Sequence, residues 1–116
     1  DKWQEIGNLK YEKKTDKELK HLFSSCCAND ILSLFDGKLY RCPVSANGEK
    51  IGAIPNFKDD YIDIHNFSGG PVQLKKQLSS YYLDKEYINA CKYCKGREYG
   101  DGNVPSAIQV KAPMPF

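Results

Sequence analysis

The sequence lacks three features that would assign it to common classes of protein. No apolar run approaches the roughly 18 residues that a membrane-spanning helix needs, and no early apolar block resembles a secretory signal peptide. The 17 basic and 15 acidic residues leave a net charge of only +2, without the basic excess of a nucleic-acid-binding surface. We therefore expect a cytoplasmic protein whose partners include neither a membrane nor nucleic acid.

The chain is also short, and its cysteines are odd in number. Its 116 residues suit one domain with a modest core. It begins at Asp1 rather than methionine, so we expect a piece of a longer protein. Five cysteines cannot all pair with one another, although spacing alone still allows a bridge such as Cys42 to Cys91. A CxxC pair in a reducing compartment is more often a pair of metal ligands or a redox pair.

Two local motifs predict secondary structure in the first half of the chain. Thr15 followed by Glu18 fits a capping box, and the apolar stripe after it predicts a helix over residues 16–25. The dipeptide Asp36-Gly37 lies between two apolar runs, as in a hairpin with a type I′ turn. We expect this hairpin to pair strands over residues 31–35 and 38–42.

The second half predicts loops and two further helices. Residues 44–60 contain the turn signal Asn47-Gly48 and others, so we expect loop with at most one turn of helix there, followed by a short strand at Tyr61, Ile62 and Ile64. Gly70-Pro71 fits the start of a helix that runs to about residue 83, and a second short helix is expected over 84–90. Residues 98–116 are rich in glycine and proline and predict an irregular tail.

These elements predict a small single α+β domain, with a short antiparallel β-hairpin and two or three helices. We expect the acidic residues Asp59, Asp60 and Asp63 to form a solvated turn, because no partner spacing supports a calcium loop. The expected core consists of Leu22, Phe23, Leu32, Leu34, Leu39, Ile62, Leu74, Leu78 and Tyr82.

Four cysteines carry the chemistry that the sequence suggests. Cys27, Cys42, Cys91 and Cys94 are separated by 14, 48 and 2 residues, and the CxxC turn lets two sulfurs face one metal. Cys26 is the alternative to Cys27 as the first ligand. Four thiolates suit either a closed zinc site or an iron–sulfur cluster, and spacing does not distinguish them.

Three basic residues surround the CxxC turn, namely Lys92, Lys95 and Arg97. Positive charge there would lower the pKa of the thiols and offset the charge of a tetrathiolate centre. An ordinary exposed loop explains these residues equally well.

The pattern Cys27, Gly37, Cys42 and Cys91-x-x-Cys94 resembles the auxiliary-cluster domains of radical S-adenosylmethionine enzymes, the SPASM domain and its shorter relative, the twitch domain. The similarity covers about residues 20–97. It implies that these four cysteines ligate one four-iron four-sulfur cluster. The chain lacks the further cysteines of a full SPASM domain and the CxxxCxxC motif that holds the radical-generating cluster, so the resemblance implies a twitch-like domain without catalytic residues of its own.

The resemblance further implies the electron-handling part of a larger oxidoreductase. A catalytic barrel domain, joined in cis or acting in trans, would bind S-adenosylmethionine and act on a peptide or small-molecule substrate. The alternative is a structural zinc module for protein–protein contact, built on the same thiolates. A thiol oxidoreductase using Cys91 and Cys94 is disfavoured because the CxxC does not follow a strand in a βαβ pattern.

Overall fold

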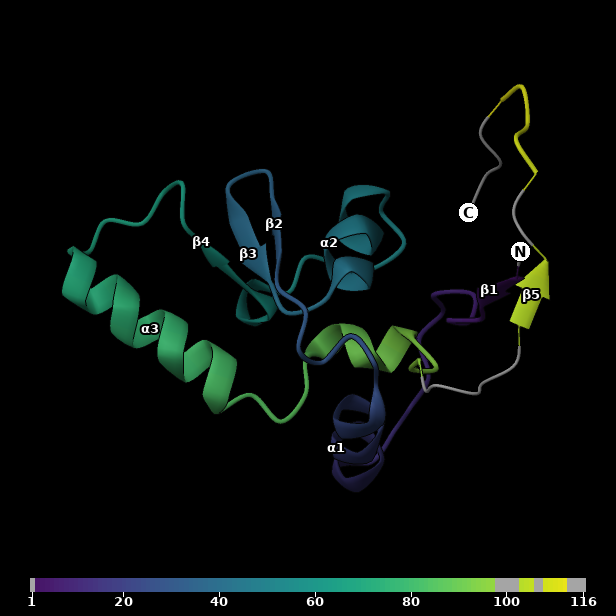
Figure 1. Cartoon of the computed structure of the whole chain (residues 1–116), viewed down its shortest axis with the longest axis horizontal. Helices are drawn as coiled ribbons and strands as arrows, with labels where there is room; N and C mark the ends of the chain where they lie inside the picture. Colours follow the sequence, from purple (N-terminus) through teal and green to yellow (C-terminus); the bar gives the residue numbers. More distant parts are fainter. Residues whose placement is uncertain (1, 98–102, 106–107, 113–116) are drawn as a thin grey trace.

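The computed structural model describes residues 2–97, 103–105 and 108–112. It has the α+β architecture that the sequence predicts, with short strands and three α-helices placed around them. Figure 1 shows a two-stranded ribbon at one end of the molecule and helix α3 at the other. In chain order the elements are β1 Lys2–Gln4, α1 Asp16–Ser25, β2 Ser33–Phe35, β3 Lys38–Tyr40, α2 Pro43–Lys50, η1 Lys58–Asp60, β4 Tyr61–Asp63, α3 Pro71–Leu83, η2 Asn89–Tyr93 and β5 Asn103–Pro105, where η marks a 3-10 helix.

The predicted hairpin is present and is extended by a third strand. Asp36 and Gly37 both have positive φ, 48° and 73°, as a type I′ turn requires. The strands β2 and β3 are shorter than expected, and β4 pairs antiparallel with β3 so that Ile62 faces Leu39. The turn is also held from outside, because the backbone N–H of His65 donates to the carbonyl oxygen of Gly37 at 3.0 Å.

Helix α1 has the bounds that the sequence predicts. The capping box is complete, since the Thr15 hydroxyl accepts from the Glu18 backbone N–H and the Glu18 carboxylate accepts from the Thr15 N–H. The helix buries Leu19 and Phe23 and ends at Cys26, whose backbone is extended. It therefore delivers the first cysteines to the core through its C-terminal end.

The expectation of loop over residues 44–60 was wrong for its first part, where α2 forms. Pro43 stands in the first turn of this helix, where its missing N–H is harmless. The Asn47 side chain donates to the Pro43 carbonyl oxygen at 2.8 Å. Gly48 provides close packing instead of a turn, because a Cβ at this position would lie 2.6 Å from Cδ1 of Ile54.

Helix α3 begins at Pro71 as predicted, but the short helix expected over 84–90 lies further along the chain. The short helix of this region is η2, which contains three of the four residues of the CxxC segment. Figure 1 shows η2 at the centre of the molecule, between α1 and the three-stranded sheet. The CxxC segment, residues 91–94, is called the knuckle below.

The tail is not irregular throughout. Its described segment 103–105 forms β5, which pairs antiparallel with β1 at the other end of the chain. The rest of the predicted tail over 98–102, 106–107 and 113–116 lies outside the described residues. No helix in the described part of the chain is long and apolar enough to cross a membrane.

The core was predicted only in part. Phe23 and Ile62 are buried as expected, whereas Leu34 is 68% exposed and Tyr82, at 39%, gives its expected place to Tyr81. Leu32 is also exposed, and the remaining four expected core residues are only partly buried. The buried cluster instead consists of Leu19, Phe23, Ile54, Ile88, Ala90 and Cys91. The core thus forms between α1 and η2, next to the cysteines.

Candidate metal centre

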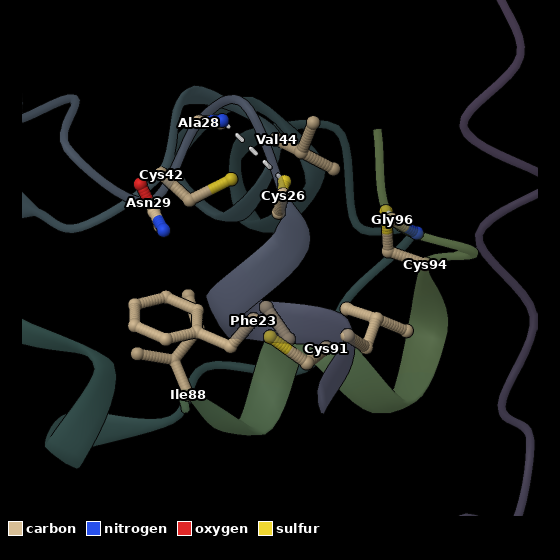
Figure 2. A pocket seen from close by; sticks show the side chains of 12 residues that line it. Phe23, Cys26, Ala28, Asn29, Cys42, Val44, Ile88, Cys91, Cys94 and Gly96 are labelled. Atoms are coloured by element: carbon tan, nitrogen blue, oxygen red, sulfur yellow. Dashed lines mark hydrogen bonds between the residues drawn. The ribbon is translucent and has the colours of Figure 1, made fainter. Parts of the chain in front are cut away.

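Four cysteines from three distant parts of the chain line one cavity, called the cysteine cavity below. Cys26 comes from the end of α1, Cys42 from the residue between β3 and α2, and Cys91 and Cys94 from the knuckle. Figure 2 shows their side chains around this cavity. No disulfide joins the cysteines, so the Cys42–Cys91 bridge that spacing allowed does not form in the described structure.

Cys27, the first ligand that the sequence favoured, does not line the cavity; its neighbour Cys26 does. Helix α1 ends just before this pair: Cys26 has an extended backbone, and Cys27 begins a turn. The backbone N–H of Cys27 donates to the carbonyl oxygen of Arg97 at 2.7 Å, which fixes it toward the chain after the knuckle. The placement therefore favours the alternative ligand, Cys26.

The rest of the cavity wall is almost entirely apolar. The cavity has a volume of about 30 Å³. Its other lining residues are Leu22, Phe23, Ala28, Asn29, Val44, Ile88, Ala90 and Gly96. Among them only Asn29 carries a polar side chain, so the thiols face a medium of low polarity.

This environment disfavours free thiolates. Burial raises the pKa of Cys91 to about 12, and the neighbouring thiols Cys42 and Cys94 add to the rise. Burial likewise raises the pKa of Cys42 and of Cys94 above the ordinary value. A bound cation reverses this balance, because it replaces the proton as the partner of each sulfur.

Backbone amides already point at the sulfurs. The N–H of Ala28 donates to Sγ of Cys26 at 3.5 Å, and the N–H of Gly96 donates to Sγ of Cys94 at 3.3 Å. In both cases the donor lies two residues after the cysteine. Hydrogen bonds to sulfur favour the thiolate and tune iron–sulfur and zinc centres.

Cys42 receives the same kind of support at the start of α2. Burial is the dominant influence on its pKa, but hydrogen bonds from the backbone of Ser45 and Val44 oppose the rise. These groups belong to the first turn of α2, whose unpaired N–H groups and positive dipole end stabilise negative charge. A hydrogen bond from the backbone of Ile88 likewise opposes the rise in the pKa of Cys91, so all four cysteines are provided with amide donors.

Lys14 is a positive group beside the knuckle that the sequence reasoning missed. Its ammonium donates to the carbonyl oxygens of Cys91 and Cys94, at 3.2 and 3.1 Å. Its side chain is only 13% exposed. Lys14 and Arg97 both lower the pKa of Cys94 against the effect of burial. The lysine thus fixes both ends of the knuckle, and its ammonium is also paired with Glu12 at 3.2 Å.

Of the three cations predicted to surround the knuckle, Arg97 acts on a cysteine, whereas the two lysines have other partners. Lys95 pairs with Glu5 at 3.1 Å, and Lys92 donates to the side-chain oxygen of Asn89 at 3.5 Å. No short-range motif marks Lys14, because its partners lie 77 and 80 residues away in the sequence.

Asp60 holds the start of η2, and the expectation that it lies in a solvated turn was wrong. The residue is 2% exposed. Its Oδ1 accepts from the backbone and side-chain N–H groups of Asn89, at 2.8 and 3.0 Å, and its Oδ2 accepts from the Ala90 N–H at 2.8 Å. Ala90 precedes Cys91 directly, so the carboxylate fixes the entry into the knuckle.

The same buried network reaches the segment that carries Cys42. The Tyr81 hydroxyl donates to the backbone carbonyl oxygen of Asp60 and accepts from the Arg41 backbone N–H at 3.0 Å. Tyr81 is buried, and burial raises the pKa of its hydroxyl. Residues next to Cys42 and Cys91 are therefore connected through two buried polar side chains.

The sulfurs surround the cysteine cavity without converging on one point. Within residues 2–97, 103–105 and 108–112, no three histidine, cysteine or acidic side chains are grouped closely enough to hold a metal ion. No family model, curated protein or solved structure matches this chain. The resemblance to SPASM and twitch domains therefore stays a prediction, and the assignment of the site depends on its own chemistry.

Proposed function

We propose that this chain is an iron–sulfur domain in which Cys26, Cys42, Cys91 and Cys94 ligate one four-iron four-sulfur cluster. The observation that carries the proposal is the gathering of four thiols from three separated segments around a single, mostly apolar cavity. Thiolates are the usual ligands of such clusters. Cys26 replaces Cys27 in the ligand set because it lines the cavity.

The surroundings of the sulfurs support a thiolate centre. Amide donors reach Cys26, Cys42 and Cys94, and the ammonium of Lys14 lies against the knuckle. These groups offset the negative charge that four thiolates bring into an apolar site. Unpaired thiols buried for packing alone would need neither the amides nor the lysine.

Four thiols suit either a four-iron cluster or a single zinc ion. Zinc draws four sulfurs to about 2.3 Å from one centre, whereas a four-iron cluster occupies more space between its ligands. The described part of the chain holds no group close enough for one ion. A structural zinc module for protein–protein contact is the second candidate. It requires the four sulfurs to move toward one centre.

When bound, such a cluster supplies one-electron transfer or a seat for substrate. The chain's own residues hold the thiolates, exclude water through the apolar wall and place Lys14 and Arg97 beside Cys94. We propose that the domain serves a radical S-adenosylmethionine oxidoreductase in the cytoplasm, where thiols stay reduced. The catalytic barrel would bind S-adenosylmethionine and act on a peptide or small molecule.

Anaerobic reconstitution tests the proposal. The purified chain is incubated with iron and sulfide, and we expect a brown protein with about four irons and four sulfides per chain. Cys26→Ser should abolish cluster uptake, and Cys27→Ser is the matched control that should retain it. Tight zinc at one ion per chain with no cluster uptake would refute the iron–sulfur assignment. Loss of uptake in Cys27→Ser alone would restore the ligand that the sequence favoured.

A further inference from the structure

Arg41, the residue before Cys42, is a buried cation whose hydrogen-bonding groups are incompletely used. It is 4% exposed. Its guanidinium carbon lies 5.4 Å from the centre of the Phe23 ring and 4.5 Å from that of Tyr82. These rings cover the faces of the guanidinium and stabilise its charge through cation–π contacts, but they offer nothing to its N–H groups.

The edge of the guanidinium lacks acceptors. Its Nε and Nη1 are buried, and neither has a hydrogen-bond partner in the part of the chain that the structure describes. A buried donor without an acceptor costs about 1–3 kcal/mol, and more when it is charged. Such a group in a folded protein calls for an acceptor from outside the chain, such as an ion, a water or a ligand.

A cavity opens beside this guanidinium, and its wall is mainly basic. It is called the arginine cavity below, and its volume is about 420 Å³, within the usual range for sites that bind small molecules. Lys20, His21, Arg41 and Lys85 line it, together with the acidic residues Asp30 and Glu86. A negatively charged group would here meet several donors at once.

The salt bridges of this wall engage Lys20 but neither Arg41 nor Lys85. Glu86 is already paired with Lys20 at 2.8 Å, and Lys20 also contacts Asp16 at 3.2 Å. Lys85 forms no salt bridge within the described residues. Arg41, Lys85 and Asp30 form no salt bridge in the described part of the chain.

We propose that the arginine cavity binds an oxyanion, the phosphate or carboxylate group of a small ligand, with Arg41 and Lys85 as its partners. Arginine presents several N–H donors in a plane and is well suited to such groups. Arg41 lines the cavity, so an oxyanion bound there would lie beside its positive charge. The inference does not depend on a cluster in the cysteine cavity.

The arginine cavity lies next to the proposed cluster site. Phe23 and Asn29 line both the arginine cavity and the cysteine cavity, so the two cavities lie on either side of the same side chains. Arg41 and Cys42 are consecutive residues. An anionic ligand held by Arg41 would therefore lie next to the cluster ligands, as a substrate or its charged end must.

Titration of the chain with inorganic phosphate and, in a second series, with sodium acetate tests the proposal. Binding is followed by calorimetry and by amide chemical shifts around residues 20–24, 41 and 85. We expect saturable binding of at least one probe, weakened at least tenfold in Arg41→Lys and about threefold in Lys85→Gln. Lys75→Gln on the exposed face of α3 removes the same charge away from the cavity and should leave the affinity unchanged.

The two probes distinguish the sources of the oxyanion, since tighter phosphate indicates a phosphate ester and tighter acetate indicates a carboxylic acid. Lys85→Gln carries the test if Arg41→Lys does not fold, because Lys85 is only partly buried. The proposal is overturned if neither probe saturates. It is equally overturned if Lys75→Gln weakens binding as much as Lys85→Gln does, because the effect would then be one of overall charge.

Discussion

Replacing Asp60 by asparagine should loosen the segment that carries Cys91. The carboxylate accepts three hydrogen bonds from Asn89 and Ala90, and these bonds hold the first turn of η2. Asparagine has the same shape but offers one acceptor oxygen, so its NH₂ group must face an N–H donor in a buried place. The matched control is Asp59→Asn, because Asp59 is the preceding residue and is exposed.

Two opposing effects set the size of the change. A buried donor left without its acceptor costs about 1–3 kcal/mol. Burial raises the pKa of Asp60, although the hydrogen bonds from Asn89 and Ala90 oppose it, so the ionised carboxylate carries a desolvation cost that asparagine avoids. The lost bonds should prevail, because three donors converge on a residue that is only 2% exposed. We expect a net loss of about 2 kcal/mol in the free energy of unfolding.

Thermal unfolding followed by circular dichroism measures this loss. For a chain of 116 residues, 2 kcal/mol corresponds to a decrease in Tm of roughly 8 °C. The thiols of Cys91 and Cys94 should also react faster with an alkylating reagent, because the knuckle opens more often. If Asp60→Asn and Asp59→Asn differ by less than about 2 °C in Tm, and the thiol reactivity is unchanged, Asp60 does not hold the knuckle.

Three further predictions concern the elements that position the site. Lys14→Met should speed alkylation of the knuckle thiols several-fold, because the knuckle carbonyls lose their ammonium, whereas Lys13→Met at an exposed position should not. Gly37→Ala should destabilise the hairpin by about 1–3 kcal/mol in urea unfolding, since φ is positive and the new Cβ would lie 2.5 Å from Cβ of His65; an unchanged midpoint would contradict the turn geometry. Hydrogen bonds from the backbone and hydroxyl of Thr15 hold the pKa of Glu18 below its usual 4.5. The stabilisation from the Glu18 carboxylate is therefore complete above pH 4.5 and is lost as the pH falls through the lowered pKa. The Tm difference between wild type and Glu18→Gln should therefore shrink in acid, and a difference that grows would refute this sign.

The sequence by itself determined the elements whose causes lie within a few residues. The capping box of Thr15 and Glu18 set the start of α1, and the dipeptide Asp36-Gly37 set the turn of the hairpin. Pro71 likewise marked the start of α3. Each depends on backbone conformation and on hydrogen bonds between near neighbours, which the sequence displays directly. The α+β class could be predicted because it follows from these local elements taken together.

The tertiary structure decided which side chains face inward and which groups support the cysteines. Cys26 rather than Cys27 lines the cavity because of where α1 ends. If the helix ended one residue later, Cys27 would take that position. Asp60 and Lys14 find their partners 29 to 80 residues away. No local pattern encodes such contacts, because the packing of η1 and of the segment before α1 against η2 brings the partners together. The sequence alone suggests that Asp60 and Lys14 are exposed, but in the structure both side chains are largely buried and hold the knuckle.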